Sequence, residues 1–191
     1  MQQARADYWQ SIRDIAPENL VFMDEAGLHL AMVRLYARSL KGQRAVGDRP
    51  VNRGKNVSLV NALSLRGPLA PLMIVGAMDG LTFEAYIIRR VAPNLWPGAV
   101  LVVDNSPTHV ATDDVNAALE AVGARLVFLP PYSPDFSPIE PFWSKVKTSL
   151  NALAARTYQA LKEALDFAYA QVSLEDILSW FTMDCYCTSS E

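Results

Sequence analysis

Apolar positions along the chain follow two periods, which predict an alternation of strands and helices. Continuous or alternating apolar runs predict five strands, at 20–33, 57–65, 69–78, 99–103 and 125–129. Helical spacing of apolar residues predicts helices at 5–16, 82–91, 111–122, 138–154 and 157–181, the last either continuous or broken near Ser173. Three strands that can pair as hairpins precede alternating helices and strands. This order predicts an α/β protein with a mixed five-stranded sheet flanked by helices.

Local signals set the expected ends of these elements. Pro17 ends the first helix, because proline has no N–H group to donate within a helix. Thr82 can cap the second helix, and Thr112 or Asp113 can cap the third, since short polar side chains accept hydrogen bonds from free N–H groups. Gly123 then stops the third helix.

Two of the expected strands show no polar alternation. Ala99–Val103 and Arg125–Leu129 are largely apolar, so we expect both to be covered on both faces. The helix between them should make the connection a right-handed parallel crossover. Gly27 marks either a turn or a bulge inside one long first strand. Taken together, the element order is that of an RNase H-like fold.

Composition limits the class of protein more than its activity. With 191 residues, of which 51% are hydrophobic and 19% charged, the chain suits one globular domain. We expect residues 1–17 to form a linker helix and residues 18–191 the domain. No apolar run could span a bilayer and the first residues lack a signal-peptide core, so we expect a cytoplasmic protein with no membrane contact. The two cysteines, Cys185 and Cys187, read as ordinary thiols.

Positive charge is concentrated in one irregular stretch, although the net charge of the chain is −3. Residues 34–55 contain seven basic side chains and a single acid, Asp48, whereas the rest of the chain is acidic on balance. The stretch has no period and contains three glycines and a proline, which indicates a long loop. Its length and charge bias favour contact with phosphate groups over a merely solvated surface.

Two aspartates interrupt apolar runs that otherwise belong in a core. Asp24 follows Leu20–Met23, and Asp104 follows Leu101–Val103. A buried aspartate is costly unless it is paired, hydrogen-bonded or bound to metal. If their strands are neighbours, the two carboxylates lie close together, and a divalent cation relieves their repulsion. Oxygen ligands suit Mg²⁺ or Mn²⁺, and a pair of such ions can serve phosphodiester cleavage or transfer.

A third carboxylate arrives on a stiff proline-rich run, residues 129–143. Ser137 is suited to cap the following helix, Pro138 to its first position, and Glu140 to its third. Glu140 is therefore either the structural half of a capping box or a third metal ligand, and the two roles are compatible, because a helix N-terminus favours an ionised carboxylate.

These residues together match a family pattern. Asp24-Glu25 after a strand, Asp104-Asn105 with His109 five residues on, and Pro130-Pro131-Tyr132-Ser133-Pro134-Asp135 before Pro138-Ile139-Glu140 closely resemble DDE transposases of the bacterial insertion-sequence branch related to mariner elements. Thirty-five residues separate Asp104 from Glu140, which agrees with that family. The family usually has asparagine where this chain has Ser137.

The resemblance implies a function and a site. Asp24, Asp104 and Glu140 would bind two Mg²⁺ or Mn²⁺ ions, cut DNA at the ends of an insertion element, and join the freed 3′-hydroxyl to target DNA. Asn105 and His109 would position a ligand or phosphate, although His109 could equally be a surface histidine. Glu25 and Asp135 are expected to lie outside the metal site.

The resemblance also implies partners. The basic stretch falls where related transposases carry a clamp-like loop, so we expect a homodimer through residues 34–55. Double-stranded DNA would contact a set of basic side chains: Arg34, Arg38, Lys41, Arg44, Arg53, Lys55 and Lys147. Only one short helix precedes the first strand, so the N-terminal helix-turn-helix reader of such transposases is expected to be absent. An inactive DNA- or subunit-binding remnant and another RNase H-like nuclease are the alternatives.

Overall fold

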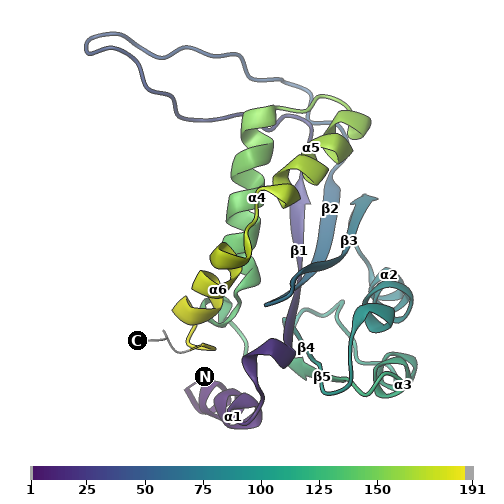
Figure 1. Ribbon diagram of the computed structural model, residues 1–191. Helices are drawn as coiled ribbons and strands as arrows, with labels where there is room; N and C mark the ends of the chain where they lie inside the picture. The colour runs from purple at the N-terminus through teal and green to yellow at the C-terminus, as the bar shows by residue number, and fades with distance from the viewer. Residues whose placement is uncertain (1, 188–191) are drawn as a thin grey trace.

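A mixed five-stranded sheet forms the centre of the computed structural model, which describes residues 2–187 (Figure 1). Its order is β3-β2-β1-β4-β5. β1 pairs antiparallel with β2 and parallel with β4, while β2–β3 is antiparallel and β4–β5 parallel. The predicted mixed sheet is therefore confirmed. The strand bounds are β1 Leu20–Leu28, β2 Val57–Ser64, β3 Gly67–Val75, β4 Val100–Val103 and β5 Arg125–Phe128.

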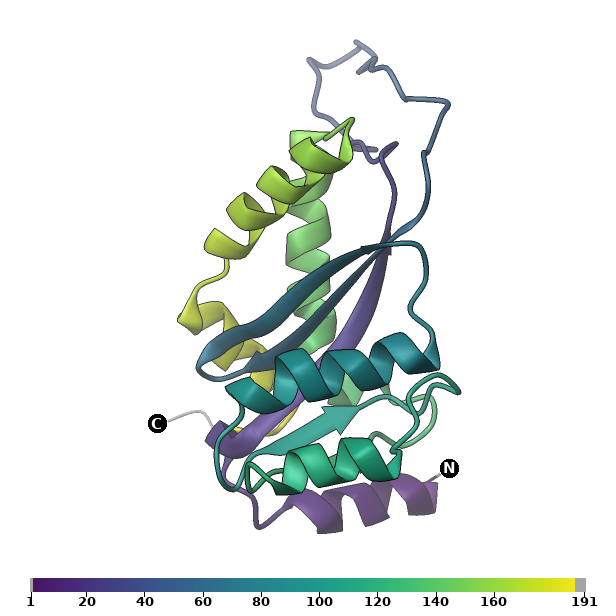
Figure 2. The ribbon, with the colours of Figure 1, turned by 90° about the vertical axis from the view of Figure 1, so that its right-hand side faces the viewer.

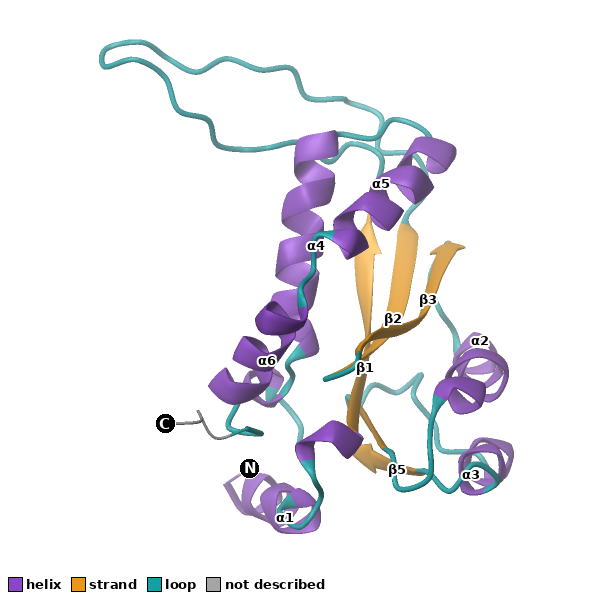
Figure 3. Ribbon diagram, in the orientation of Figure 1, coloured by secondary structure: helices purple, strands orange, loops and turns teal. Residues whose placement is uncertain are grey.

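Six α-helices are found in the described residues, and they cover the two faces of the sheet. In Figure 3, α4, α5 and α6 lie on one side of the strands, and α2 and α3 lie on the other. A π-helical turn, η2 (Ile87–Val91), extends α2. The helix bounds are α1 Gln2–Ile12, α2 Gly80–Tyr86, α3 Asp113–Glu120, α4 Ile139–Leu153, α5 Tyr158–Ala170 and α6 Leu174–Met183.

The sheet separates two apolar cores, because successive side chains of a strand point to opposite faces. On β1, Phe22 joins the core beneath α4, α5 and α6, and its ring meets Phe181 edge-on at 5.4 Å. Val21 and Met23 join the other core, beneath α2 and α3. Helix α1 also packs into the first core, where the Tyr8 hydroxyl lies 2.8 Å from that of Tyr186.

Two strand predictions are wrong in detail. Residues 125–129 were expected to be covered on both faces, but β5 is the edge strand and its residues are exposed or half-buried. An apolar run cannot by itself distinguish an edge strand from a central one. Gly27 is neither a turn nor a bulge, since it pairs with Ser58 in an unbroken register and the strand ends at Leu28.

Helix ends are also corrected in part. Asp79, not Thr82, caps α2, and the Thr82 N–H group donates to the Asp79 carboxylate at 2.8 Å. The first helix ends at Ile12, before Pro17. Thr112 caps α3, as one of the two predicted alternatives. None of the helices described is long and apolar enough to cross a membrane.

The predicted long loop is confirmed. Residues 34–55 contain no helix or strand, and the loop extends away from the sheet beyond the ends of α4 and α5 (Figures 1 and 2). Its base is fixed by hydrogen bonds: the Leu30 N–H group donates to the Arg53 carbonyl at 2.9 Å, and the Lys55 N–H group to the Tyr158 hydroxyl at 2.8 Å. The loop is thus anchored at its base and projects at its tip.

Candidate active site

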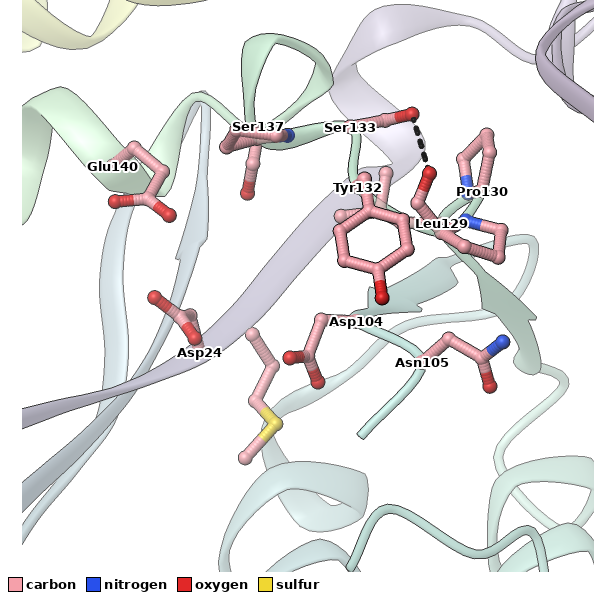
Figure 4. A pocket seen from close by; sticks show the side chains of 12 residues that line it. Asp24, Asp104, Asn105, Leu129, Pro130, Tyr132, Ser133, Ser137 and Glu140 are labelled. Atoms are coloured by element: carbon pink, nitrogen blue, oxygen red, sulfur yellow. Dashed lines mark hydrogen bonds between the residues drawn. The ribbon is translucent and has the colours of Figure 1, made fainter. Parts of the chain in front are cut away.

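The three acids singled out in the sequence line one cavity of about 370 Å³. Asp24 comes from β1, Asp104 directly follows β4, and Glu140 comes from the first turn of α4. Figure 4 shows the Asp24 and Glu140 carboxylates turned toward each other, with Asp104 close by. Residues from the proline-rich run complete the wall. The fold thus brings together carboxylates that are as many as 116 positions apart in the sequence.

The pairing of β1 with β4 explains why the two aspartates are neighbours. Met23 is in register with Val103 on the adjacent parallel strand, and each aspartate is the next residue. Asp24 lies on the same face of β1 as Phe22 and Ala26, both of which face the core beneath α4. Its carboxylate is thereby directed to the side from which Glu140 approaches.

The start of α4 differs from the prediction. Ser137 was expected to cap the helix with its side chain, but no side-chain capping bond to α4 occurs among the described residues. Instead, the Ser137 carbonyl accepts the Glu140 N–H group at 2.9 Å. The reason is a short 3-10 turn, η4 (Pro134–Phe136), which runs into Ser137 and delays the helix to Ile139. Ser137 is buried and lines the cavity.

Burial raises the pKa of Asp24 to about 6. Loss of hydration is the largest cause, and the negative charges of Glu140 and Asp104 raise the pKa further. The cavity therefore destabilises the ionised form of Asp24. A cation bound between these carboxylates would offset that destabilisation.

His109 holds Asp104 in place through a hydrogen bond. The His109 Nδ1 atom makes a short hydrogen bond to one carboxylate oxygen of Asp104, and this bond is the main reason that the pKa of Asp104 is lowered. The imidazole is buried and stacks on Phe83 of α2, with ring centres 4.6 Å apart. The surface interpretation of His109 is therefore wrong: the residue fixes one oxygen of Asp104. Asn105, exposed at the cavity rim, turns away from the three carboxylates (Figure 4).

Comparison with known proteins adds the family. The family model described as DDE superfamily endonuclease matches residues 19–162, about three quarters of the chain. The chain belongs to the DDE superfamily endonucleases. A comparison with curated protein sequences finds no match.

Solved structures of Mos1 transposase share the fold of this DDE family member. A pre-cleavage Mos1 transpososome is 17% identical, with a TM-score of 0.74 over 97% of this chain and 58% of the other. The Mos1 paired-end complex with Mn is 16% identical, with a TM-score of 0.70 over 96% of this chain and 58% of the other. The Mos1 catalytic domain is 14% identical, with a TM-score of 0.65 over 97% of this chain and 86% of the other. The predicted RNase H-like fold is thus confirmed, and the chain spans less than two thirds of the longer Mos1 chains.

The donor set of the cavity suits a hard divalent cation. Carboxylate oxygens are the ligands that Mg²⁺ and Mn²⁺ prefer. Within residues 2–187, no three acidic, histidine or cysteine side chains lie close enough together to hold a single ion. Mg²⁺ usually takes one or two carboxylates and leaves its other positions to water and substrate oxygens. Glu25 and Asp135 do not line the cavity.

An arginine that sequence reasoning missed holds the proline-rich run in place. Arg5 of α1 donates to Asp135 at 2.5 and 3.0 Å and to the Ser133 hydroxyl at 3.0 Å. Its guanidinium also lies 3.9 Å from the centre of the Phe136 ring. Ser133 lines the cavity, so α1 grips the segment that forms the cavity wall and leads to Glu140. No sequence signal links residues about 130 positions apart.

Removing the contacts of Arg5 with Ser133 and Asp135 should lower the rate of DNA cleavage more than it lowers the stability of the fold. We expect Arg5→Ala to lower the rate of DNA cleavage about tenfold, because small displacements of a ligand-bearing segment cost orders of magnitude in rate. Exchanging the charges, with Arg5→Asp and Asp135→Arg together, should recover part of the loss. A cleavage time course on wild type and these two variants checks this. Equal rates for wild type and Arg5→Ala would show that the grip has no role.

The basic residues expected to contact DNA occupy two places. Those in the loop are all exposed and lie away from the carboxylates: Arg34, Arg38, Lys41, Arg44, Arg53 and Lys55. Lys147 is half-buried on α4, two turns after Glu140, and lines a separate cavity at the base of the loop. The sequence correctly placed Lys147 on the helix of Glu140, but it gave no sign of that second cavity.

Proposed function

We propose that this chain is the catalytic part of a DNA transposase, which cuts DNA at the ends of an insertion element and joins the ends to target DNA. The observation that carries the proposal is the convergence of Asp24, Asp104 and Glu140 on one cavity in a member of the DDE endonuclease family. The Mos1 structures that share this fold include pre-cleavage, paired-end and strand transfer complexes, and their likeness supports DNA as the substrate.

The three carboxylates would hold two divalent ions, Mg²⁺ or Mn²⁺, against the scissile phosphate. Such ions supply an activated attacking oxygen and stabilise the leaving one. Mos1 complexes that contain Mn and Mg support this choice of metal. The chain itself orients the ligands: His109 holds one oxygen of Asp104, and the Arg5 grip holds the segment before Glu140.

The long loop would contact DNA and a second copy of the chain. Its basic side chains are exposed and concentrated in a segment that the body of the domain touches only at its base. Contacts of this kind bind phosphate without reading sequence. Because the loop also projects from the domain, we propose a homodimer in which residues 34–55 contact both the partner subunit and the DNA.

Removing the loop tip should separate dimerisation from folding. We expect that replacing residues 34–52 with a short Gly/Ser linker leaves the melting temperature within a few degrees, because the tip buries little apolar surface. The deletion should convert a dimer into a monomer in light scattering coupled to size-exclusion chromatography. A dimer that survives the deletion would rule out the loop as its interface.

Cleavage of duplex DNA tests the proposal directly. The substrate is a duplex carrying the terminal repeat of the element, incubated with Mn²⁺ or Mg²⁺ and, in parallel, with EDTA. Metal-dependent nicking that requires all three acids supports a DDE enzyme. Stable folding and DNA binding with no cleavage under any metal would favour the inactive remnant. Preferential cutting of an RNA strand would favour another RNase H-like nuclease.

A further inference from the structure

A second cavity, of about 230 Å³, lies where the long loop leaves the sheet. The end of β1, the first loop residues and the middle of α4 line it. Its polar lining consists of hydrogen-bond donors and no carboxylate from the described residues: His29, Arg49, Lys147 and Asn151. A cavity of this composition is suited to an anion.

The histidine of this cavity is set up as a neutral donor. The His29 Nδ1 atom accepts the Ala31 N–H group at 3.1 Å, so the neutral ring carries its proton on Nε2. Partial burial and the positive charges of Arg53 and Arg49 lower the pKa of His29. The ring therefore adds a hydrogen bond for an anion without adding charge.

Most of the cavity lining comes from segments that hydrogen bonds hold in place, whereas Leu35 and Arg49 come from the loop. The Arg156 guanidinium donates to the Leu30 and Met32 carbonyls at 3.1 and 3.0 Å, which ties the start of the loop to the turn after α4. The Leu30–Arg53 bond joins the two sides of the loop at the same level. Lys147 and Asn151 are presented by consecutive turns of α4.

The position of the cavity relative to the active site favours a DNA phosphate as the anion. Lys147 lies seven residues after Glu140 on the same helix face, which is about 10 Å along the axis at 1.5 Å per residue. A DNA backbone that enters the active site along this face of α4 would therefore also pass the second cavity.

We propose that this cavity binds one backbone phosphate of the DNA, outside the active site. Lys147 and Arg49 share that phosphate, and His29 and Asn151 complete its hydrogen bonds. The inference rests on the proposed function, since it takes DNA as the substrate. It adds a defined contact that sets how far the strand enters the site.

The salt dependence of DNA binding tests whether the two cations share one phosphate. Each phosphate neutralised contributes about −0.9 to the slope of log K against log salt. Fluorescence anisotropy with a labelled 30-base-pair duplex in EDTA excludes cleavage during the titration with KCl. We expect the double variant Lys147→Ala, Arg49→Ala to reduce the slope by about 0.9, whereas two separate phosphates would give about 1.8.

A matched control removes two positive charges elsewhere. Arg13 and Lys162 are exposed and do not line the cavity, so Arg13→Ala with Lys162→Ala should leave the slope as in wild type. His29→Asn keeps an acceptor for the Ala31 N–H group and removes the distal donor. We expect it to weaken binding a few-fold at unchanged slope, as a neutral ligand should.

The outcomes separate this inference from the proposed function. A slope that changes by about 1.8, or no more than in the control, would overturn the shared phosphate. Wild type that binds duplex without salt dependence would overturn DNA as the substrate. The expected slopes combined with no cleavage under any metal would support the phosphate cavity and count against the transposase activity alone.

Discussion

Replacing Glu140 with glutamine is expected to lower the rate of DNA cleavage on the order of a thousandfold, or about 4 kcal/mol of transition-state stabilisation. Glutamine keeps the shape of the side chain but removes the charge that a divalent ion requires. Glu140 is exposed at the start of α4, and the core contacts of that helix come from other residues, such as Phe142 and Val146. The loss should therefore appear in the rate and not in the stability.

Strand β1 offers a matched control for this experiment. Glu25 follows Asp24 on β1 and does not line the cavity, so Glu25→Gln removes one carboxylate from the opposite face of the sheet. We expect this variant to cleave at the wild-type rate. Comparable cleavage by wild type and Glu140→Gln, with Mn²⁺ in both assays, would show that Glu140 is not needed for catalysis.

Replacing Asp24 with asparagine should stabilise the protein in EDTA at pH 8 while removing its response to metal. The pKa of Asp24 is raised from 3.8 to about 6, which corresponds to about 3 kcal/mol of cost for the ionised form in the folded state. Asn61 is opposite Asp24 on β2, fully buried, and its side-chain oxygen has no partner within residues 2–187. The new amide group would meet an acceptor there.

The pH dependence follows from the direction of the pKa shift. Because the folded carboxyl binds its proton more tightly than the unfolded one, wild-type stability falls as pH rises from about 4 to about 6 and then levels off. The advantage of Asp24→Asn should thus be present above pH 6 and vanish below pH 4. At pH 8 in EDTA it should amount to about 10 °C in melting temperature.

Addition of Mn²⁺ supplies the second half of this test. An ion that binds only the folded state stabilises it by mass action, so the melting temperature of wild type should rise with Mn²⁺ concentration. The rise should be much smaller for Asp24→Asn, which lacks one charged ligand. Differential scanning fluorimetry measures both effects. An Asp24→Asn variant that melts below wild type in EDTA at pH 8 would show that the ionised Asp24 carboxylate does not destabilise the folded state.

Local sequence singled out the three acids that line the candidate active site. Asp24 and Asp104 stand out because each interrupts an apolar strand, and Glu140 because a proline-rich run leads directly to its helix. These are short-range signals, set by burial period, proline geometry and the cost of a buried charge. The same signals gave the order of strands and helices, and hence the fold.

Tertiary structure decided what each of those residues touches. The Arg5 grip on Asp135 joins segments that are 130 positions apart, and the cavity at the base of the loop combines residues from three separate segments. β5 is an edge strand because it pairs with β4 on one side and with no strand of residues 2–187 on the other, which its own apolar run does not show. Periodicity and composition act over a few residues, whereas hydrogen bonds, burial and pKa shifts depend on neighbours that only the folded chain brings together.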